Sequence, residues 1–394
     1  MRFSALGMAA GRASLRRVSV SPAQLGQIVD VFERNFREMG ELGASLSIWW
    51  NGEEILGEAD GWCDKAKSRP WTTQTLVPMY SVTKGPSAAT LLMALESRGL
   101  GPETPVREVW PAFPVAATFA ELLSHQTGMA ALDRRTSVWE HDEVVAAIEA
   151  QAPAWPLGEG HGYHPRTFGA LLEEPVRRLT GKPLGAYFRQ VLGDPLGLEF
   201  WIGLPEHCHP RVATLYPGKA DKSDLQHGFY SEYHREGSLV RRAFSSPRGI
   251  HSVQDMNDPK AWTAGFPALG GIGTASALAK FYQAVIGGIA SPLSPAVRAA
   301  MATTRVQGDD RILMRETAFT CGFQKDPVGA DGVKLRRLYG SSPEAFGHPG
   351  AGGSHAFGDP STGISFAYVM NQMELGVFPG QKSRDLIEAL FDEG

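Results

Sequence analysis

Hydrophobic and polar positions alternate in two distinct ways near the start of the chain. After Ser21-Pro22, apolar residues recur at helical spacing as far as about Gly40, which predicts one amphipathic helix. The next two apolar runs, at about 44–50 and 54–59, are separated by Asn51-Gly52, the strongest short signal for a hairpin turn. We therefore expect a helix followed by a β-hairpin.

The other end of the chain mirrors this order. Strands are predicted at about 354–357 and 364–371, with turn residues at 359–363 between them, and a terminal helix at about 381–391. Because both ends of the chain combine a helix with strands, we expect them to assemble into one α/β layer.

Most segments between the two ends show helical periodicity. The predicted helices lie at about 87–95, 119–123, 143–151, 167–179, 184–191 and 275–286. Residues 216–265 are rich in Gly, Pro, Ser and charge, with scattered aromatic residues. We interpret this span as a long irregular excursion bordering a cleft, although a surface insertion without a role fits nearly as well.

The pattern predicts an α+β protein with an antiparallel sheet, flanking terminal helices and a mostly helical insertion. We assign residues 1–20 to an N-terminal extension, 21–62 and 300–394 to the α/β domain, and 63–299 to the inserted domain. A helical insertion over a sheet leaves a cleft between two layers, where small-molecule sites tend to lie.

Composition narrows the class of partner. The 394 residues carry a formal charge of −4 with 43% hydrophobic and 20% charged residues, so there is no basic footprint for nucleic acid or acidic membrane. Cys63, Cys208 and Cys321 are too few and too far apart for a disulfide framework. Without a recognisable export signal or an apolar run of about 20 residues, we expect a cytoplasmic protein, and a homo-oligomer is left open.

The candidate chemistry begins at Ser81-Val82-Thr83-Lys84. Residues three apart on a helix share one face, so a helix beginning here presents the amine of Lys84 to the Ser81 hydroxyl. A helix N-terminus also favours negative charge at that hydroxyl. The tetrapeptide alone fits a capping serine and a solvated lysine better, so the assignment depends on its context.

Three further segments supply that context. They are Leu122-Leu123-Ser124-His125-Gln126-Thr127-Gly128-Met129, Gly162-Tyr163-His164-Pro165-Arg166-Thr167-Phe168-Gly169 and Gly347-His348-Pro349-Gly350-Ala351-Gly352-Gly353. With Ser81 and Lys84, they resemble in order and spacing the serine β-lactamase and penicillin-recognising superfamily. Within it, the chain is most similar to the β-lactamase-like carboxylesterases of esterase family VIII, from about residue 22 to the end.

The resemblance implies a β-lactamase-like, transpeptidase-like fold and a set of roles. Ser81 is the implied nucleophile, Lys84 and Tyr163 its joint proton-transfer partners, and the backbone N–H groups of Ser81 and Ala351 the oxyanion hole. His348, Gly350 and Gly352 are the implied substrate-binding residues.

The chain departs from the family pattern at three positions. Pro165 stands where the family has asparagine, and His348-Pro349 replaces Lys-Thr or His-Thr. These changes weaken contacts to an acylamino group and a carboxylate, and therefore favour neutral esters over penicillins and peptides.

Other signals are weaker. No Gly-x-Ser-x-Gly occurs, which argues against an α/β-hydrolase elbow. Gly271-Ile272-Gly273-Thr274-Ala275-Ser276 lacks the third glycine and the later acid of a dinucleotide loop, and His207-Cys208-His209 lacks a second ligand cluster. We expect no cofactor and no metal, and His125 and Ser124 fit a bracing role better than a reactive one.

The leading hypothesis is a carboxylesterase that acts on a small-molecule, short-chain ester through an acyl-enzyme on Ser81. A β-lactamase, or a small-amide or D-amino-acid peptidase of the same superfamily, is the nearest alternative. From another class, a catalytically inactive binding relative remains, but it would not require Ser81, Lys84 and Tyr163 together.

Overall fold

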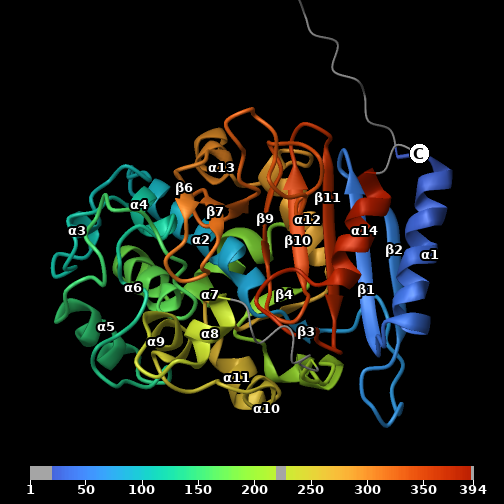
Figure 1. Ribbon diagram of the computed structural model, residues 1–394, viewed down its shortest axis with the longest axis horizontal. Coiled ribbons are helices and arrows are strands. Elements are labelled where there is room, and N and C mark those ends of the chain that lie inside the picture. The colour runs from blue at the N-terminus through green and yellow to red at the C-terminus, as the bar shows by residue number, and fades with distance from the viewer. Residues whose placement is uncertain (1–19, 219–227, 392–394) are drawn as a thin grey trace, which may run out of the picture.

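An eight-stranded antiparallel sheet organises the structure, a computed structural model that describes residues 20–218 and 228–391. Its strand order is β2-β1-β11-β10-β9-β8-β7-β6 (Figure 1). The strands are β1 (Gly43–Trp50), β2 (Glu53–Gly61), β6 (Val306–Asp309), β7 (Glu316–Phe319), β8 (Gln324–Lys325), β9 (Phe346–Pro349), β10 (His355–Asp359) and β11 (Ile364–Met370). The predicted hairpin is confirmed, with Asn51 and Gly52 both at positive φ in its turn.

The two ends of the chain meet on one face of this sheet. Helices α1 (Pro22–Glu38) and α14 (Gln381–Phe391) pack against each other, as Figure 1 shows. Side chains along β11 alternate between two cores: Phe366 and Tyr368 pack with the terminal helices, and Ala367 and Val369 face the other core. This period of two is what a sheet covered on both faces requires. The predicted fold class is therefore confirmed.

Helix α12 (Ala275–Ile286) covers the opposite face of the sheet, against β1, β10 and β11. The buried amide of Gln283 donates to the Gly363 carbonyl at 3.0 Å and to Ser365 Oγ at 3.1 Å. We had assigned this helix to the inserted domain, but it packs against the sheet. The division into domains otherwise stays a prediction.

The remaining helices form the region beside the sheet. They are α2 (Lys84–Glu96), α3 (Val106–Val109), α4 (Phe119–Leu123), α5 (His141–Glu149), α6 (Phe168–Thr180), α7 (Leu184–Phe188), α8 (Gly228–His234), α9 (Leu239–Ser245), α10 (Val253–Met256), α11 (Pro259–Ala264) and α13 (Pro295–Ala302), with short turns η1 (Ser81–Thr83), η2 (Arg189–Gly193) and η3 (Glu206–Arg211). A small second sheet, β3-β5-β4, was not predicted; its strands are β3 (Val77–Pro78), β4 (Phe200–Ile202) and β5 (Gly271–Gly273).

The predicted irregular excursion at 216–265 is wrong for its described residues. Helices α8 to α11 lie within them, joined by short loops, and part of the prediction, residues 219–227, lies outside the described residues. The aromatic residues that looked scattered in the sequence pack together, with the Phe229 ring centroid 5.5 Å from that of Phe244. Their packing stabilises helices too short to persist alone.

No helix in the described ranges is long and apolar enough to cross a membrane.

Candidate active site

Ser81 occupies the first position of the turn η1, which runs directly into α2. The preceding residue, Tyr80, has φ 48° and ψ −131°, a conformation that residues with a Cβ rarely adopt. Thr83 stabilises it, because its hydroxyl donates to the Tyr80 carbonyl and accepts the Gly271 N–H at 2.8 Å. The turn therefore holds Ser81 in one orientation, with its side chain only partly buried.

The amine of Lys84 is fully buried, and its nitrogen has three close neighbours. Nζ lies 3.1 Å from Ser81 Oγ, 2.9 Å from the Pro165 carbonyl oxygen and 2.8 Å from the Ala268 carbonyl oxygen. No acidic side chain in the described chain forms an ion pair with Lys84. Burial lowers the pKa of Lys84 well below its ordinary value, and the positive charge of Arg166 lowers it further.

Tyr163 joins this pair from the loop before α6. Its side chain is buried, its hydroxyl is hydrogen-bonded to Ser81, and its ring centroid lies 4.9 Å from Lys84 Nζ. Burial raises the pKa of Tyr163 above its ordinary value. The structure thus brings together the three residues predicted as catalytic, and it favours the uncharged form of both Lys84 and Tyr163.

A buried carboxylate that the sequence analysis missed holds the backbone of Tyr163. Both oxygens of Asp310 accept the Tyr163 N–H at 3.1 Å, and Oδ1 also accepts the N–H groups of Ile312 and Leu313 at 2.8 Å. Thr317 donates its hydroxyl to Oδ2 at 3.2 Å. Burial raises the pKa of Asp310 to about 6, against the opposing effect of these donors. Nothing in the local sequence around Asp310 signals this contact.

Buried histidines surround the Tyr163 ring. The His125 ring lies 5.1 Å from it between centroids, and His125 Nδ1 accepts the His164 N–H at 3.3 Å. The His125 carbonyl accepts the Gly162 N–H at 3.1 Å. Burial holds the pKa of His125 well below its ordinary value, with a further contribution from the His164 charge. Through these contacts His125 holds the backbone on both sides of Tyr163, which fits the predicted bracing role.

The segment after β9 approaches the residues just before the turn η1 closely, because Gly350 has no side chain. A Cβ at Gly350 would lie 2.3 Å from the Met79 carbonyl oxygen, too close for any other residue without movement. The Gly350 N–H donates to Ser354 at 2.7 Å, whereas the N–H of the next residue, Ala351, has no acceptor within the described chain. The N–H of Ser81 is also without an acceptor there.

His348 and Gly352 each form a hydrogen bond to a backbone carbonyl, and their role in substrate binding stays a prediction. The His348 side chain is buried, its Nδ1 bonds to the Pro349 carbonyl oxygen at 2.8 Å, and its ring centroid lies 5.8 Å from that of Tyr163. Burial lowers the pKa of His348 to about 3, which favours the neutral ring. The N–H of Gly352 donates to the Gly376 carbonyl, so this residue shapes the turn after β9.

Helices α8 and α9 supply an aromatic wall beside Tyr163. Phe229, Val240 and Ala243 belong to the same buried cluster as Tyr163 and Phe319, and Phe378 packs against it. The described part of the 216–265 span therefore borders the site, as predicted. In the described ranges, no three His, Cys, Asp or Glu side chains are grouped so that they could hold a metal ion.

Comparisons with known proteins agree with this geometry. The beta-lactamase family model matches residues 32–390. The chain is 30% identical over 347 residues to the esterase/beta-lactamase LipL of Mycobacterium tuberculosis, covering 84% of this chain and 77% of LipL. A penicillin-binding protein homologue from Caulobacter crescentus has a TM-score of 0.82 at 34% identity, covering 94% of this chain and 98% of that structure. A family VIII carboxylesterase has a TM-score of 0.81 at 30% identity, covering 95% and 98%. The resemblance inferred from the sequence motifs is confirmed, and the chain belongs to the beta-lactamase family.

Proposed function

We propose that this chain is a serine esterase that hydrolyses short-chain carboxylic esters through an acyl-enzyme on Ser81. The environment of the Lys84 amine carries the proposal. A neutral amine has two N–H bonds and one lone pair. In the structure Nζ lies 2.9 and 2.8 Å from the carbonyl oxygens of Pro165 and Ala268 and 3.1 Å from Ser81 Oγ. When Lys84 is neutral, its two N–H bonds can stay on these carbonyls, and its lone pair then faces Ser81 Oγ. In this state Lys84 can accept the proton of Ser81.

Tyr163 then serves as the second proton carrier. Its raised pKa keeps the phenol protonated, and its hydroxyl contacts Ser81. When Ser81 Oγ attacks the ester carbonyl carbon, the Ser81 proton passes to Lys84 Nζ. As the bond from the acyl carbon to the alcohol oxygen breaks, Tyr163 delivers a proton to that oxygen and is reprotonated by Lys84. Water repeats the attack on the acyl-enzyme and releases the acid.

The developing oxyanion requires donors that are not already used. The N–H groups of Ser81 and Ala351 have no acceptor within the described chain, and Gly350 allows their two segments to approach. We assign them to the oxyanion hole. Removing one such donor typically lowers kcat by about 10²–10³.

The neutral surroundings of the site support an ester substrate over a β-lactam. A β-lactam carries a carboxylate that needs a cationic partner when it loses water. Here His348 is buried and neutral, and Pro349 has no hydroxyl to offer. Two of the similar proteins, the family VIII carboxylesterase and the esterase/beta-lactamase LipL, are named as esterases, which also supports ester hydrolysis.

The proposal is tested with p-nitrophenyl esters of rising acyl length beside nitrocefin. We expect activity to be highest at about two to six acyl carbons, since a cleft between two layers is finite. Ser81→Ala should lower kcat by about 10⁴ or more. Ser97→Ala is the matched control, because this exposed serine caps the end of the same helix.

A fluorophosphonate probe identifies the nucleophile independently. It should label the wild type and Ser97→Ala at Ser81 and should not label Ser81→Ala. Labelling at another serine contradicts the nucleophile. Turnover of nitrocefin at a kcat/KM equal to or above that of the best ester contradicts the substrate class and favours a β-lactamase.

A further inference from the structure

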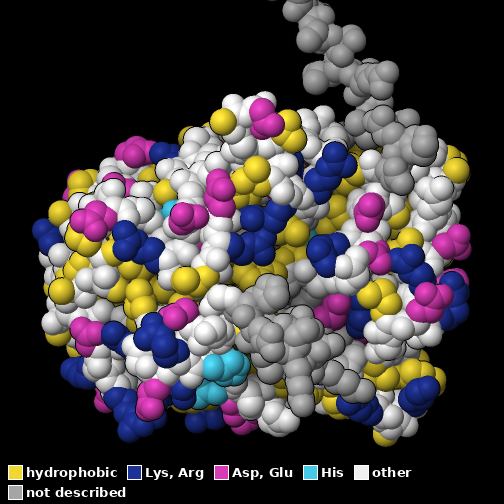
Figure 2. All heavy atoms as spheres, in the orientation of Figure 1, with side chains coloured by type: hydrophobic (Ala, Val, Ile, Leu, Met, Phe, Trp, Pro, Cys, Tyr) yellow, Lys and Arg dark blue, Asp and Glu magenta, His cyan; other side chains and the backbone are white. Residues whose placement is uncertain are grey.

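Four arginines line a cavity of about 560 Å³ between α14 and the loop that precedes β9. They are Arg315, Arg336, Arg337 and Arg384. Glu388 is the one acidic side chain among the described residues of the lining. Figure 2 shows Lys and Arg side chains gathered near the middle of this face, beside exposed hydrophobic surface. The cavity therefore concentrates positive charge, and none of these residues belongs to the proposed catalytic site.

None of the four arginines forms an ion pair with another described residue, whereas Arg34 pairs with Asp385 and Arg305 with Glu103. Their guanidinium groups are left with unused donors. Arg336 donates Nη2 to a carbonyl oxygen of β7, but its Nε is buried and has no partner. Buried donors without acceptors are rare in folded proteins, and an unidentified ligand is one physical explanation.

The arginines also repel one another. The Arg315 guanidinium carbon lies 4.2 Å from the Phe378 ring centroid and is partly buried. Burial lowers the pKa of Arg315 to about 10, and the charges of Arg336 and Arg384 contribute to this lowering. Four like charges held together in a concave site, with Glu388 as the one acidic side chain of its described lining, favour the binding of an anion.

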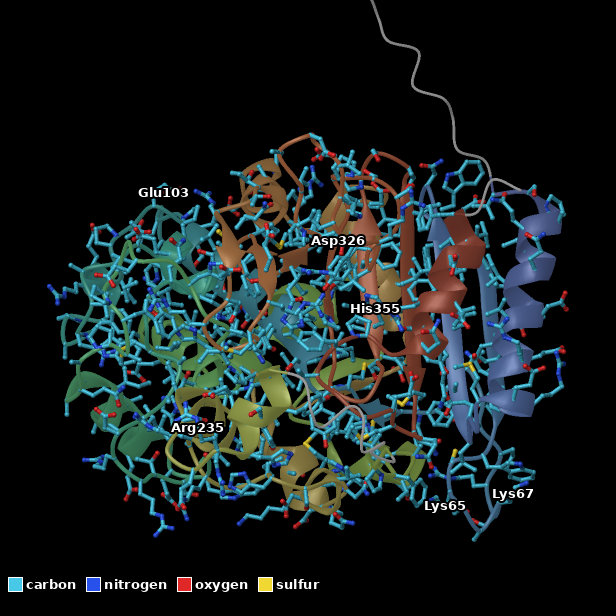
Figure 3. All side chains as sticks on the ribbon, in the orientation of Figure 1. Lys65, Lys67, Glu103, Arg235, Asp326 and His355 are labelled. Carbon is cyan, nitrogen blue, oxygen red and sulfur yellow. The ribbon has the colours of Figure 1, made fainter. Side chains whose placement is uncertain are left out.

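The nearest buried carboxylate is already engaged elsewhere. Asp326, labelled in Figure 3 beside the strands of the large sheet, forms an ion pair with Lys334 at 2.8 Å. It also accepts the N–H groups of Leu338 and Tyr339 at 3.1 and 3.0 Å. Asp326 therefore orders the loop that carries Arg336 and Arg337, and its negative charge, which also acts on Arg315 and Arg336, is shared with Lys334.

We propose that this arginine cavity binds a small organic polyanion that carries phosphate or carboxylate groups. Guanidinium groups match both kinds of oxygen through paired hydrogen bonds, and four of them line this cavity. The cavity is too large for one inorganic ion, and Leu338, Ile387 and Phe391 give it an apolar side. The ligand thus combines at least two anionic groups with an apolar or planar body.

Isothermal titration of the full-length chain with pyrophosphate, ADP and citrate tests the proposal, at constant ionic strength set with NaCl. The variant Arg336→Gln/Arg384→Gln should weaken the tightest probe about tenfold or more, because each removes a charge-assisted hydrogen bond. Arg337→Gln, on an exposed side chain, is a second variant that leaves the packing intact. The control Arg37→Gln/Arg235→Gln removes the same charge from exposed surface pairs and should change Kd by less than about twofold.

The outcomes separate the sources of the anion. Tighter binding of pyrophosphate or ADP identifies a phosphate ligand, and tighter binding of citrate identifies a polycarboxylate; binding should be unchanged in Ser81→Ala, which excludes the catalytic site. The proposal is overturned if no probe binds, or if the control variant weakens binding equally.

Discussion

Replacing Asp310 tests whether one buried carboxylate holds Tyr163, the proposed proton carrier, in place. The two variants to compare are Asp310→Asn and Asp310→Ala. Both remove the negative charge, so their difference isolates the hydrogen-bond acceptor. An asparagine oxygen in the position of Oδ1 still reaches the N–H groups of Tyr163, Ile312 and Leu313, while its amide nitrogen faces the Thr317 hydroxyl, which can accept.

The magnitude follows from the number of donors that lose their acceptor. Alanine leaves three buried backbone N–H groups unpaired, and each costs about 1–3 kcal/mol. We therefore expect Asp310→Ala to unfold with a free energy at least about 3 kcal/mol lower than that of Asp310→Asn. If the Tyr163 backbone moves by about 1 Å as a result, kcat falls by about 10².

The assay combines urea unfolding at pH 7, followed by circular dichroism, with kcat on p-nitrophenyl acetate at a temperature where both variants are folded. A structural role alone would lower stability without changing kcat of the folded fraction. Equal stability of the two variants would refute the hydrogen-bond count. Equal kcat, despite unequal stability, would refute the positioning of Tyr163.

The same carboxylate predicts a pH dependence of stability. Because burial raises the pKa of Asp310 from 3.8 to about 6, the folded chain keeps a proton that the unfolded chain releases between these values. The contribution of this group to the free energy of unfolding therefore falls by about 2–3 kcal/mol as the pH rises from about 4 to 6.5. Asp310→Asn lacks this contribution, so parallel pH curves for the wild type and this variant would contradict the raised pKa.

Three further predictions concern the reacting groups. Gly350→Ala should lower kcat by about 10²–10³ with folding retained, because the added Cβ collides with the Met79 carbonyl and moves β9 away from the turn η1. An unchanged kcat would argue against the proposed oxyanion hole. Lys84→Ala and Tyr163→Phe should each remove most activity, and the double variant should lose far less activity than the product of the two single losses. If the loss in the double variant equals that product, the two residues have separate roles. His348→Asn should leave the shape of the pH profile of kcat/KM between pH 5 and 9 unchanged, because the pKa of His348 is about 3; loss of a limb would show that His348 titrates in that range.

The local parts of this protein could be predicted from its sequence. The amphipathic helix α1, the hairpin turn at Asn51-Gly52 and the helix α12 each depend on residues that are neighbours along the chain. Ser81 and Lys84 are three residues apart, so their contact follows from one turn of helix. For the same reason, the order and spacing of the motifs were enough to identify the family.

Contacts between distant segments were decided by the tertiary structure. Strands β6 to β9, at one end of the large sheet, are short, with two to four residues each. Their positions depend on pairing with one another, so no local sequence pattern predicts them. The helices of the 216–265 span were missed for a related reason. They are held by packing of their aromatic side chains across the site, not by their own propensity.

The electrostatic state of the site was also decided by folding. Burial lowers the pKa of Lys84 well below its ordinary value, and its Nζ contacts the backbone carbonyls of Pro165 and Ala268. Every residue carries such a carbonyl, so no residue type reveals these contacts. Asp310 reaches the Tyr163 N–H across 147 positions of the chain. The sequence thus determined which groups could react, and the tertiary structure determined their charge and orientation, because desolvation and backbone hydrogen bonds arise only when distant segments pack together.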